Sequence, residues 1–353
     1  MATVVNQAGS AISAGPAPAT GTAPAVASGA ARAAGAAVAT APRRPRRAGA
    51  IRTRIEIALL AGPALVVFVG FVIVPVVLAA VYSFYNLPAA FRWSDLADPE
   101  RFVGFDNYVR ALNTPEFLRA IGNNFAILVA SLLIQGPIAI GIALLLNRRM
   151  RGRSVIRLLI FVPYVLAEVI AGLAWKLLLQ PQGGVNALLE AVGLGAWQQN
   201  WLADPNIALW TLFGILTWKY VGFAIILMLA GLQGVPEELA EAAAIDGASW
   251  WQIQRHITIP LLGPTIRIWA FLSMIGALQL FDMVWVTVAP TVRSLSTETM
   301  ATYMVQQGQF AGQPGYGSAI AVILFLISLV VALVYQRFAL RRDLAGAVTT
   351  GVR

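Results

Sequence analysis

The sequence has no cysteine, and His256 is the single histidine among its 353 residues. Disulfide bonds and thiolate metal sites are therefore excluded, and one imidazole does not build a metal site alone. Lysine is also scarce. Lys176 and Lys219 are the only two, and neither lies in the Gly-Lys-Ser/Thr context that a phosphate-binding loop requires. We therefore expect no metal, no cofactor and no catalytic residue in this chain, and no ATP hydrolysis by it.

Charge of either sign is sparse as well. Only 12% of the residues are charged and 58% are hydrophobic, whereas soluble domains have about 25% charged residues. The net charge of +9 comes almost entirely from arginines at the two ends and around 148–157. Basic clusters that flank apolar segments are typical of membrane topology signals, and no recognition helix or aromatic sheet accompanies them. The composition predicts a membrane protein and argues against nucleic-acid binding.

Long apolar runs dominate the rest of the chain. A helix needs about 20 apolar residues to cross roughly 30 Å of hydrocarbon, and six stretches qualify. They lie at about 57–81, 121–146, 158–179, 207–231, 263–285 and 316–338. The predicted fold class is all-α, a polytopic membrane bundle with six transmembrane helices.

The arginines predict how the bundle is oriented. With six spans both ends share one side, and that side holds the amino-terminal arginines, the arginines of 148–157 and those after the last span. Both termini are therefore predicted to be cytoplasmic. Residues 1–54 are rich in Ala, Pro and Arg and predict a disordered cytoplasmic tail without secretory-signal features. A membrane domain is predicted over 55–340 and a second cytoplasmic tail over 341–353.

The polar segment 232–262 lies between the fourth and fifth spans and is predicted to be cytoplasmic. Pro236 and the carboxylates that follow it favour a helix start. Asp246-Gly247 allows a left-handed turn, and a second helix is expected to continue until Pro260. The segment therefore predicts a helix-turn-helix, for which an ordinary cytoplasmic hairpin is the simplest interpretation.

The spacing within this segment resembles a known signature. Permease subunits of type I ABC importers have Glu-Ala-Ala, three residues, Gly, nine residues and Ile-x-Leu-Pro, and this chain has Glu241-Ala242-Ala243, Gly247 and Ile257-Thr258-Ile259-Pro260. Similarity to the MalF/UgpA-like permeases of carbohydrate importers extends to 102–108, 147–149 and Phe281-Asp282. The chain departs from the family pattern at Ile259, which replaces leucine, and at 289–291, where Ala-Pro-Thr replaces a common Gly-Gly-Pro run.

This resemblance implies an ATP-driven importer of a mono- or disaccharide or a related polar solute, in a bacterial cytoplasmic membrane. The implied partners are a second homologous permease, an extracytoplasmic solute-binding protein and a separate ATPase dimer, which uses the ATP and Mg. The segment 232–262 would dock on that ATPase. The implied ATPase-coupling residues are Glu241, Ala242, Ala243, Asp246, Gly247, Ile257 and Pro260.

Ionisable side chains within a span are costly, and they generally mark a pathway or a partner. Glu168 and Lys219 fall near the middle of the third and fourth spans. The predicted substrate-pathway residues are Glu168, Lys219, Tyr220, Phe223, Ser273, Ala277, Gln279 and Asp282. Ordinary helix packing is the alternative for the aromatic and small residues. If Lys219 pairs with Glu168, the site would suit a neutral sugar. If Lys219 is unpaired, the site would favour an anionic solute.

Two other functions compete with an importer. An ion-coupled secondary transporter would also have six spans with intramembrane charges, but it predicts inverted repeats, and the chain has no clear repeat. A membrane enzyme would need a nucleophile, a metal constellation or a histidine cluster, and the sequence has none of these.

Overall fold

The computed structural model describes residues 59–148 and 151–340. The two predicted tails, 1–54 and 341–353, lie outside the described residues. The chain divides into two units, Met1–Gly62 and Pro63–Arg353, and the labelled helices and turns below belong to the second unit. Its described residues form helices and one isolated bridge between Tyr85 and Phe102, without any strand. The predicted all-α class is confirmed.

The α-helices have the following bounds: α2 Val74–Tyr82, α3 Asp106–Asn113, α4 Pro115–Ala130, α5 Gly136–Leu146, α6 Arg153–Val165, α7 Glu168–Leu178, α8 Gly184–Ala191, α9 Ala208–Leu232, α10 Glu237–Ile245, α11 Trp250–Ile253, α12 Ile259–Leu261, α13 Gly263–Leu278, α14 Asp282–Thr287, α15 Pro290–Val292, α16 Met300–Val305 and α17 Pro314–Tyr335. Tight 3-10 turns form η2 Trp93–Ala97, η3 Pro99–Arg101 and η5 Gly195–Trp197. Wider π-helical turns form η1 Val69–Ile73, η4 Ser131–Gln135, η6 Gln254–Thr258, η7 Arg293–Thr297, η8 Gln306–Phe310 and η9 Gln336–Leu340.

The described chain has four helices with the length and composition of a membrane span, or up to six candidate spans if each of two bent helix pairs counts as one. Four are continuous helices, namely Leu59–Tyr82, Pro115–Leu146, Ala208–Leu232 and Pro314–Ala339. The other two are helix pairs, bent by 97° between α6 and α7 and by 66° between Trp250–Leu261 and Gly263–Leu278. The six predicted spans overlap these six segments, so the prediction of a polytopic helical membrane fold is confirmed.

The third predicted span, 158–179, is not one helix. It breaks at Leu166 and Ala167, whose backbones are extended, so Glu168 begins α7 instead of lying inside a helix. The break exposes the last carbonyls of α6, which would otherwise accept bonds from the next turn. Sequence patterning did not detect this break because both halves are apolar, and because Pro163, inside α6 and three residues before Leu166, is tolerated within a membrane helix.

The boundaries around the fifth span also differ from the prediction. The second helix of 232–262 ends at Leu261, one residue beyond the predicted end at Pro260. The wide turn η6 directly precedes α12, and such a turn accommodates the missing N–H and bulky ring of a proline inside a helix. At the other end α13 stops at Leu278 and α14 begins at Asp282, so the predicted helix 263–285 is interrupted.

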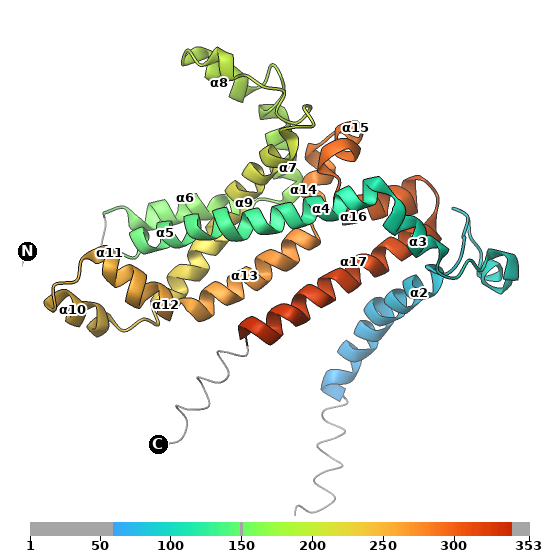
Figure 1. Ribbon diagram of the computed structural model, residues 1–353, viewed down its shortest axis with the longest axis horizontal. Coiled ribbons are helices and arrows are strands. Elements are labelled where there is room, and N and C mark those ends of the chain that lie inside the picture. The colour runs from blue at the N-terminus through green and yellow to red at the C-terminus, as the bar shows by residue number, and fades with distance from the viewer. Residues whose placement is uncertain (1–58, 149–150, 341–353) are drawn as a thin grey trace, which may run out of the picture. The chain divides into compact units, whose positions relative to one another are not determined.

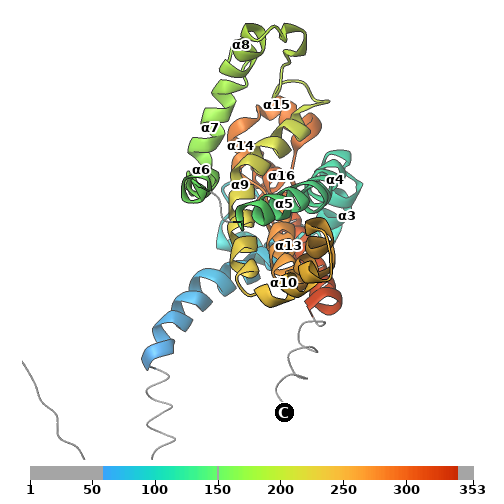
Figure 2. The same cartoon turned by 90° about the vertical axis from the view of Figure 1, so that its left-hand side faces the viewer.

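The long helix α9 is the centre of the bundle. It packs against α5, α6 and α13, while α17 packs against α2, α3 and α16 (Figures 1 and 2). Gly222 permits the crossing of α6 and α9, because a Cβ there would collide with the carbonyl oxygen of Ile160. This close approach brings Tyr164 of α6 next to the aromatic stripe of α9.

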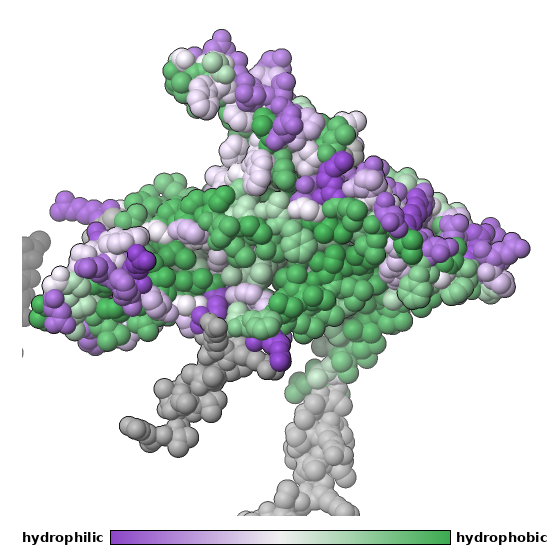
Figure 3. Space-filling model, viewed as in Figure 1, coloured by the Kyte–Doolittle hydropathy of each residue, from purple (hydrophilic) through white to green (hydrophobic). Residues whose placement is uncertain are grey.

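Much of the outer surface is apolar. Large side chains such as Phe71, Leu133, Leu159 and Phe325 are more than half exposed, and Figure 3 shows a broad hydrophobic surface over α4, α5 and α17. Hydrophilic residues gather instead around α10 and α11 and around the loops near α3. Apolar surface of this extent is expected of a protein that contacts lipid.

Candidate translocation cavity and coupling segment

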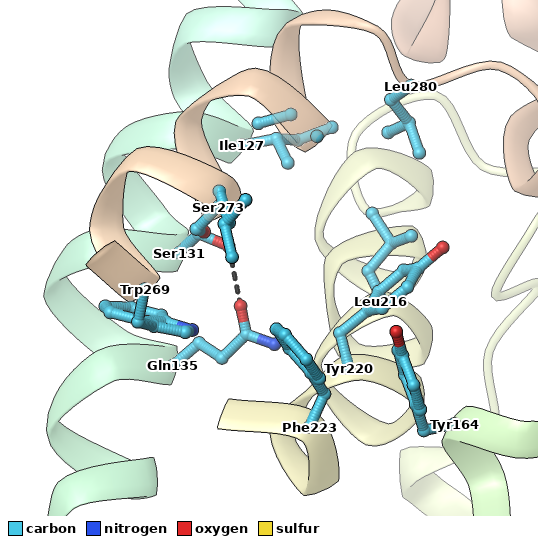
Figure 4. Close-up of a pocket in the computed structure, with 13 residues that line it drawn as sticks. Ile127, Ser131, Gln135, Tyr164, Leu216, Tyr220, Phe223, Trp269, Ser273 and Leu280 are labelled. Atoms are coloured by element: carbon cyan, nitrogen blue, oxygen red, sulfur yellow. Dashed lines mark hydrogen bonds between the residues drawn. The ribbon is translucent and has the colours of Figure 1, made fainter. Parts of the chain in front are cut away.

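A cavity of about 320 Å³ lies between α4, η4, α6, α9 and α13 (Figure 4). Its wall consists mostly of aliphatic and aromatic side chains, with a few hydroxyl and amide groups and no charged residue. The lining residues are Ile127, Ser131, Gln135, Tyr164, Leu216, Tyr220, Phe223, Trp269, Leu272, Ser273, Gly276, Ala277 and Leu280. Ligand sites commonly combine an apolar wall with a small number of placed polar groups.

Four of the eight predicted pathway residues meet in this cavity. Tyr220 and Phe223 reach it from α9, and Ser273 and Ala277 reach it from α13. The aromatic stripe and the small-residue stripe therefore face the same space, as helical spacing predicted. Their role in transport stays a prediction.

The aromatic side of the cavity is rigidly built. The ring of Tyr164 stacks on that of Phe223, with centroids 5.0 Å apart and planes inclined by 21°. Tyr220 stands edge-on to Tyr164 at 6.3 Å, and its hydroxyl donates a short hydrogen bond to Oε1 of Glu168. Glu168 does not line the cavity. It fixes the orientation of the Tyr220 ring, which does.

Two polar lining residues were missed by sequence analysis. Ser131 and Gln135 are the ends of the π-helical turn η4, and Ser131 Oγ donates to Gln135 Oε1 at 2.8 Å. A buried glutamine directly before Gly136-Pro137, within an apolar span, is the sequence signal that identifies them. Gly136 matters for the same wall, because a Cβ there would lie 2.7 Å from the ring of Trp269, another lining residue.

Lys219 has a different environment from the one that a pathway charge would have. It is 1% exposed and does not line the cavity. Its Nζ donates to the carbonyl oxygen of Leu166 at 2.6 Å and lies 3.4 Å and 3.5 Å from those of Pro163 and Tyr164. The ammonium thus caps the carbonyl end of α6, where a cation is favourable. Among the described residues, no ion pair within 4.0 Å joins Lys219 to Glu168.

The remaining predicted pathway residues, Gln279 and Asp282, are exposed and lie at the break between α13 and α14, outside the cavity wall. The fully buried Asn124, which sequence analysis missed, holds this break. Its Nδ2 donates to the carbonyl of Ala277 at 2.6 Å, and its Oδ1 accepts from the N–H of Met300 at 2.9 Å. The Asn124 amide therefore hydrogen-bonds a backbone carbonyl at the end of α13 and a backbone N–H at the start of α16.

Two charges in the segment between α15 and α16 are buried. Arg293 and Glu298 are each 3% exposed, with Nε and Oε1 4.0 Å apart. The guanidinium also lies 4.1 Å from the ring centroid of Trp285. Burial lowers the pKa of Arg293 and raises the pKa of Glu298, and each charge partly offsets the shift of the other. These residues act as a packed cluster and contribute little as exposed topology signals.

The predicted helix-turn-helix of 232–262 is present. α10 ends at Ile245, and Gly247, two residues later, has a left-handed backbone with φ of 86°. Two hydrogen bonds close the turn: Ala248 N–H donates to Ala243 O, and Gly247 N–H donates to Ala244 O. This is the double hydrogen bond expected where glycine follows a helix end. Ser249 then begins α11, and its side chain and that of Gln252 bond each other's backbone N–H groups.

The seven predicted coupling residues all lie on this segment, where Glu241, Ala242, Asp246, Gly247 and Pro260 are exposed and Ala243 and Ile257 are partly buried. A hollow of about 400 Å³ beside them is lined by Asp246, Gly247, Ala248, Gln252, Ile253, His256 and Ile257. Sequence analysis did not single out Ile245 and Trp251, which are 86% and 59% exposed. Arg148 stacks on Trp250 at 4.2 Å and ties the segment to the end of α5.

Comparison with known proteins identifies the class of protein that has this architecture. Residues 135–343 match the family described as binding-protein-dependent transport system inner membrane component. The chain belongs to this family. It is a permease subunit of an ABC transporter, so the alternatives of a secondary transporter and a membrane enzyme are set aside.

Two relatives illustrate the match. The chain is 33% identical to the trehalose/maltose transport system permease protein MalF of Thermococcus litoralis, over 69% of this chain and 83% of the relative. It is 30% identical to the arabinooligosaccharides transport system permease protein AraP of Bacillus subtilis, over 78% of this chain and 86% of the relative. In fold it resembles a chain of a bacterial alginate ABC transporter solved with an alginate-bound periplasmic protein, with a TM-score of 0.73 and 23% identity over 83% of this chain and 96% of that one.

Proposed function

We propose that this permease carries a neutral sugar, a mono- or oligosaccharide, through the cavity between α4, α6, α9 and α13. The uncharged cavity wall is the observation that carries the proposal. It offers aromatic faces for stacking on a sugar ring and hydroxyl and amide groups for its hydroxyls. The named substrates of MalF and AraP, trehalose/maltose and arabinooligosaccharides, are sugars of the same chemical kind.

The position of Lys219 favours a neutral solute over an anionic one. An anion in the cavity would need a cation or several N–H donors directed at it. The nearest ammonium is instead bonded to the carbonyls of α6, and the carboxylate of Glu168 lies behind Tyr220. Neither charge lines the cavity, so its wall offers no cation to a carboxylated or phosphorylated sugar.

The same proposal includes the partners and the orientation. A second homologous permease would complete the pathway, an extracytoplasmic binding protein would deliver the solute, and a separate ATPase dimer would use ATP and Mg. Both termini and the segment 232–262 would face the cytoplasm of a bacterial cell, because the arginines of the chain favour that side. Rocking of the permease, driven by ATPase closure, would expose the cavity alternately to the two sides.

Docking of the ATPase on α10 and α11 is supported by what this segment exposes. Glu241 offers a carboxylate to a partner's arginine, and the exposed Ile245 and Trp251 offer apolar contacts next to it. Glu241→Lys should abolish co-purification of the ATPase, while Glu100→Lys, an equivalent reversal on an exposed residue of η3, should preserve it. Co-purification that survives Glu241→Lys would contradict the assignment of this segment.

The substrate class is tested with the assembled transporter in proteoliposomes that contain ATP. Uptake of radiolabelled maltose, trehalose and arabinotriose would be compared with uptake of glucuronate and glucose 6-phosphate, each with the cognate binding protein present. ATP-dependent uptake confined to neutral sugars supports the proposal. Uptake of the anionic sugars alone, or of no sugar, would refute it.

A further inference from the structure

We propose that Gln135 is a specificity-determining residue of the cavity, and that its Nε2 donates a hydrogen bond to an oxygen of the transported sugar. This inference rests on the proposed function and adds a wall of the site that sequence analysis did not consider. The residue comes from η4, opposite the aromatic rings of α6 and α9.

The first observation is that Gln135 is a buried residue whose amide oxygen has a protein partner and whose amide nitrogen has none in the described part of the chain. The side chain is 4% exposed, and its Oε1 accepts from Ser131 Oγ at 2.8 Å. The Nε2 has no partner among the described residues. The Nε2 is not among the fully buried side-chain atoms without a partner, so it is open to the cavity and can donate to a molecule that enters there.

The second observation is the direction of that nitrogen. Figure 4 shows the Gln135 amide with its oxygen toward Ser131 and its nitrogen toward the cavity, on the side of Phe223. Both Ser131 and Gln135 line the cavity. The serine hydroxyl therefore holds the amide in one orientation and presents the donor to the space where a solute would lie.

The third observation concerns the backbone. η4 is a single π-helical turn followed by Gly136-Pro137, and the wide turn relieves the clash of the Pro137 ring with the preceding turn. The absence of a side chain at Gly136 lets Trp269 pack against this helix at the cavity. The turn thus builds a local polar site, because it sets an amide beside an indole within an otherwise apolar span.

These contacts define a division of roles. The rings of Tyr164, Tyr220 and Phe223 would contact the apolar face of a sugar and tolerate many sugars. The single oriented donor of Gln135 would distinguish a sugar with an oxygen at the matching position from one without it. A site that hydrogen-bonds a substrate oxygen rejects an analogue that lacks this oxygen, because its own polar group is left unpaired.

The test uses the complete transporter in proteoliposomes with its binding protein, and the neutral sugar of the panel above that the wild type transports. Gln135→Met keeps the side-chain length and removes the amide. We expect maximal uptake to fall about tenfold, which corresponds to one hydrogen bond, while binding-protein affinity is unchanged. Gln135→Glu lacks the amide donor, so its maximal uptake should fall at least as far. Gln182→Leu, a change at an exposed glutamine between α7 and α8, should transport normally.

The discriminating measurement uses monodeoxy analogues of that sugar. The wild type should transport one analogue about tenfold more slowly than the parent, and Gln135→Met should transport both at the same reduced rate. A role in packing alone would slow all analogues equally and would refute the inference, as would wild-type uptake by Gln135→Met or Gln135→Glu. If the wild type transports no sugar of the panel, the proposed function fails and the inference fails with it.

Discussion

Replacing Lys219 by methionine should destabilise the bend between α6 and α7. Methionine has a similar length but neither charge nor donor, so the 2.6 Å bond to Leu166 O is lost and the carbonyls at the end of α6 are left unpaired. A hydrogen bond from a charged group contributes about 1.5–3 kcal/mol, and a cation at a helix carboxyl end adds about 0.3–1 kcal/mol. The sum is about 3 kcal/mol, within a helix pair that carries Tyr164 into the cavity.

The assay is thermal unfolding of the purified complex, followed by tryptophan fluorescence, together with ATP-dependent sugar uptake. We expect the unfolding midpoint of Lys219→Met to fall by about 6 °C, and uptake to fall as the aromatic wall loses its support. Lys176→Met is the matched control, because that lysine is exposed and its single bond to Val286 O is 3.4 Å long. An unchanged midpoint would refute the capping role of Lys219, and unchanged uptake would refute its support of the aromatic wall.

Three further predictions follow from close contacts and buried charges. Gly222→Leu should destabilise the complex by about 3 kcal/mol in a melting assay, because the new side chain would force α6 and α9 apart. Gly214→Leu is the control on the same helix and should be neutral, because no atom lies within 4 Å of a Cβ at that position. Gly247→Val should cost about 1–2 kcal/mol through its left-handed backbone and should speed proteolysis of the coupling segment, while Gly247→Asn should not. Arg293→Met should cost about 3 kcal/mol by leaving Glu298 buried without its partner. Burial raises the pKa of Glu298, so the folded state favours the protonated carboxyl of this residue. The fall in unfolding midpoint caused by Arg293→Met should therefore be larger at pH 8, where Glu298 is charged, than at pH 5. An equal fall at both pH values would contradict this assignment.

Two features of the site were predictable from residue spacing alone. Tyr220 and Phe223 are three apart on one helix, and Ser273 and Ala277 are four apart on another, so each pair had to share a face. The turn at Asp246-Gly247 was likewise predictable, because glycine is the residue that adopts a positive φ without cost. These are local properties, and they depend on only a few consecutive residues.

The coupling segment shows the limit of such local reasoning. Pro260 was expected to end a helix, and the helix does end one residue later, but the wide turn η6 directly before α12 was not predicted. Gln135 also looked unremarkable within its apolar span. Its importance depends on Ser131 holding its oxygen and on the cavity beside its nitrogen, and neither is visible in a hydropathy pattern.

The sequence by itself determined the membrane class, the six apolar segments and the family, because span length, arginine placement and the spacing of 241–260 are written along the chain. Only the tertiary structure decided what the intramembrane charges do. The ammonium of Lys219 was free to pair with Glu168 or to face a solute, and the choice depended on where α6 ends. Since that end presents three carbonyls to Lys219, the charge is satisfied by backbone and the cavity wall remains neutral.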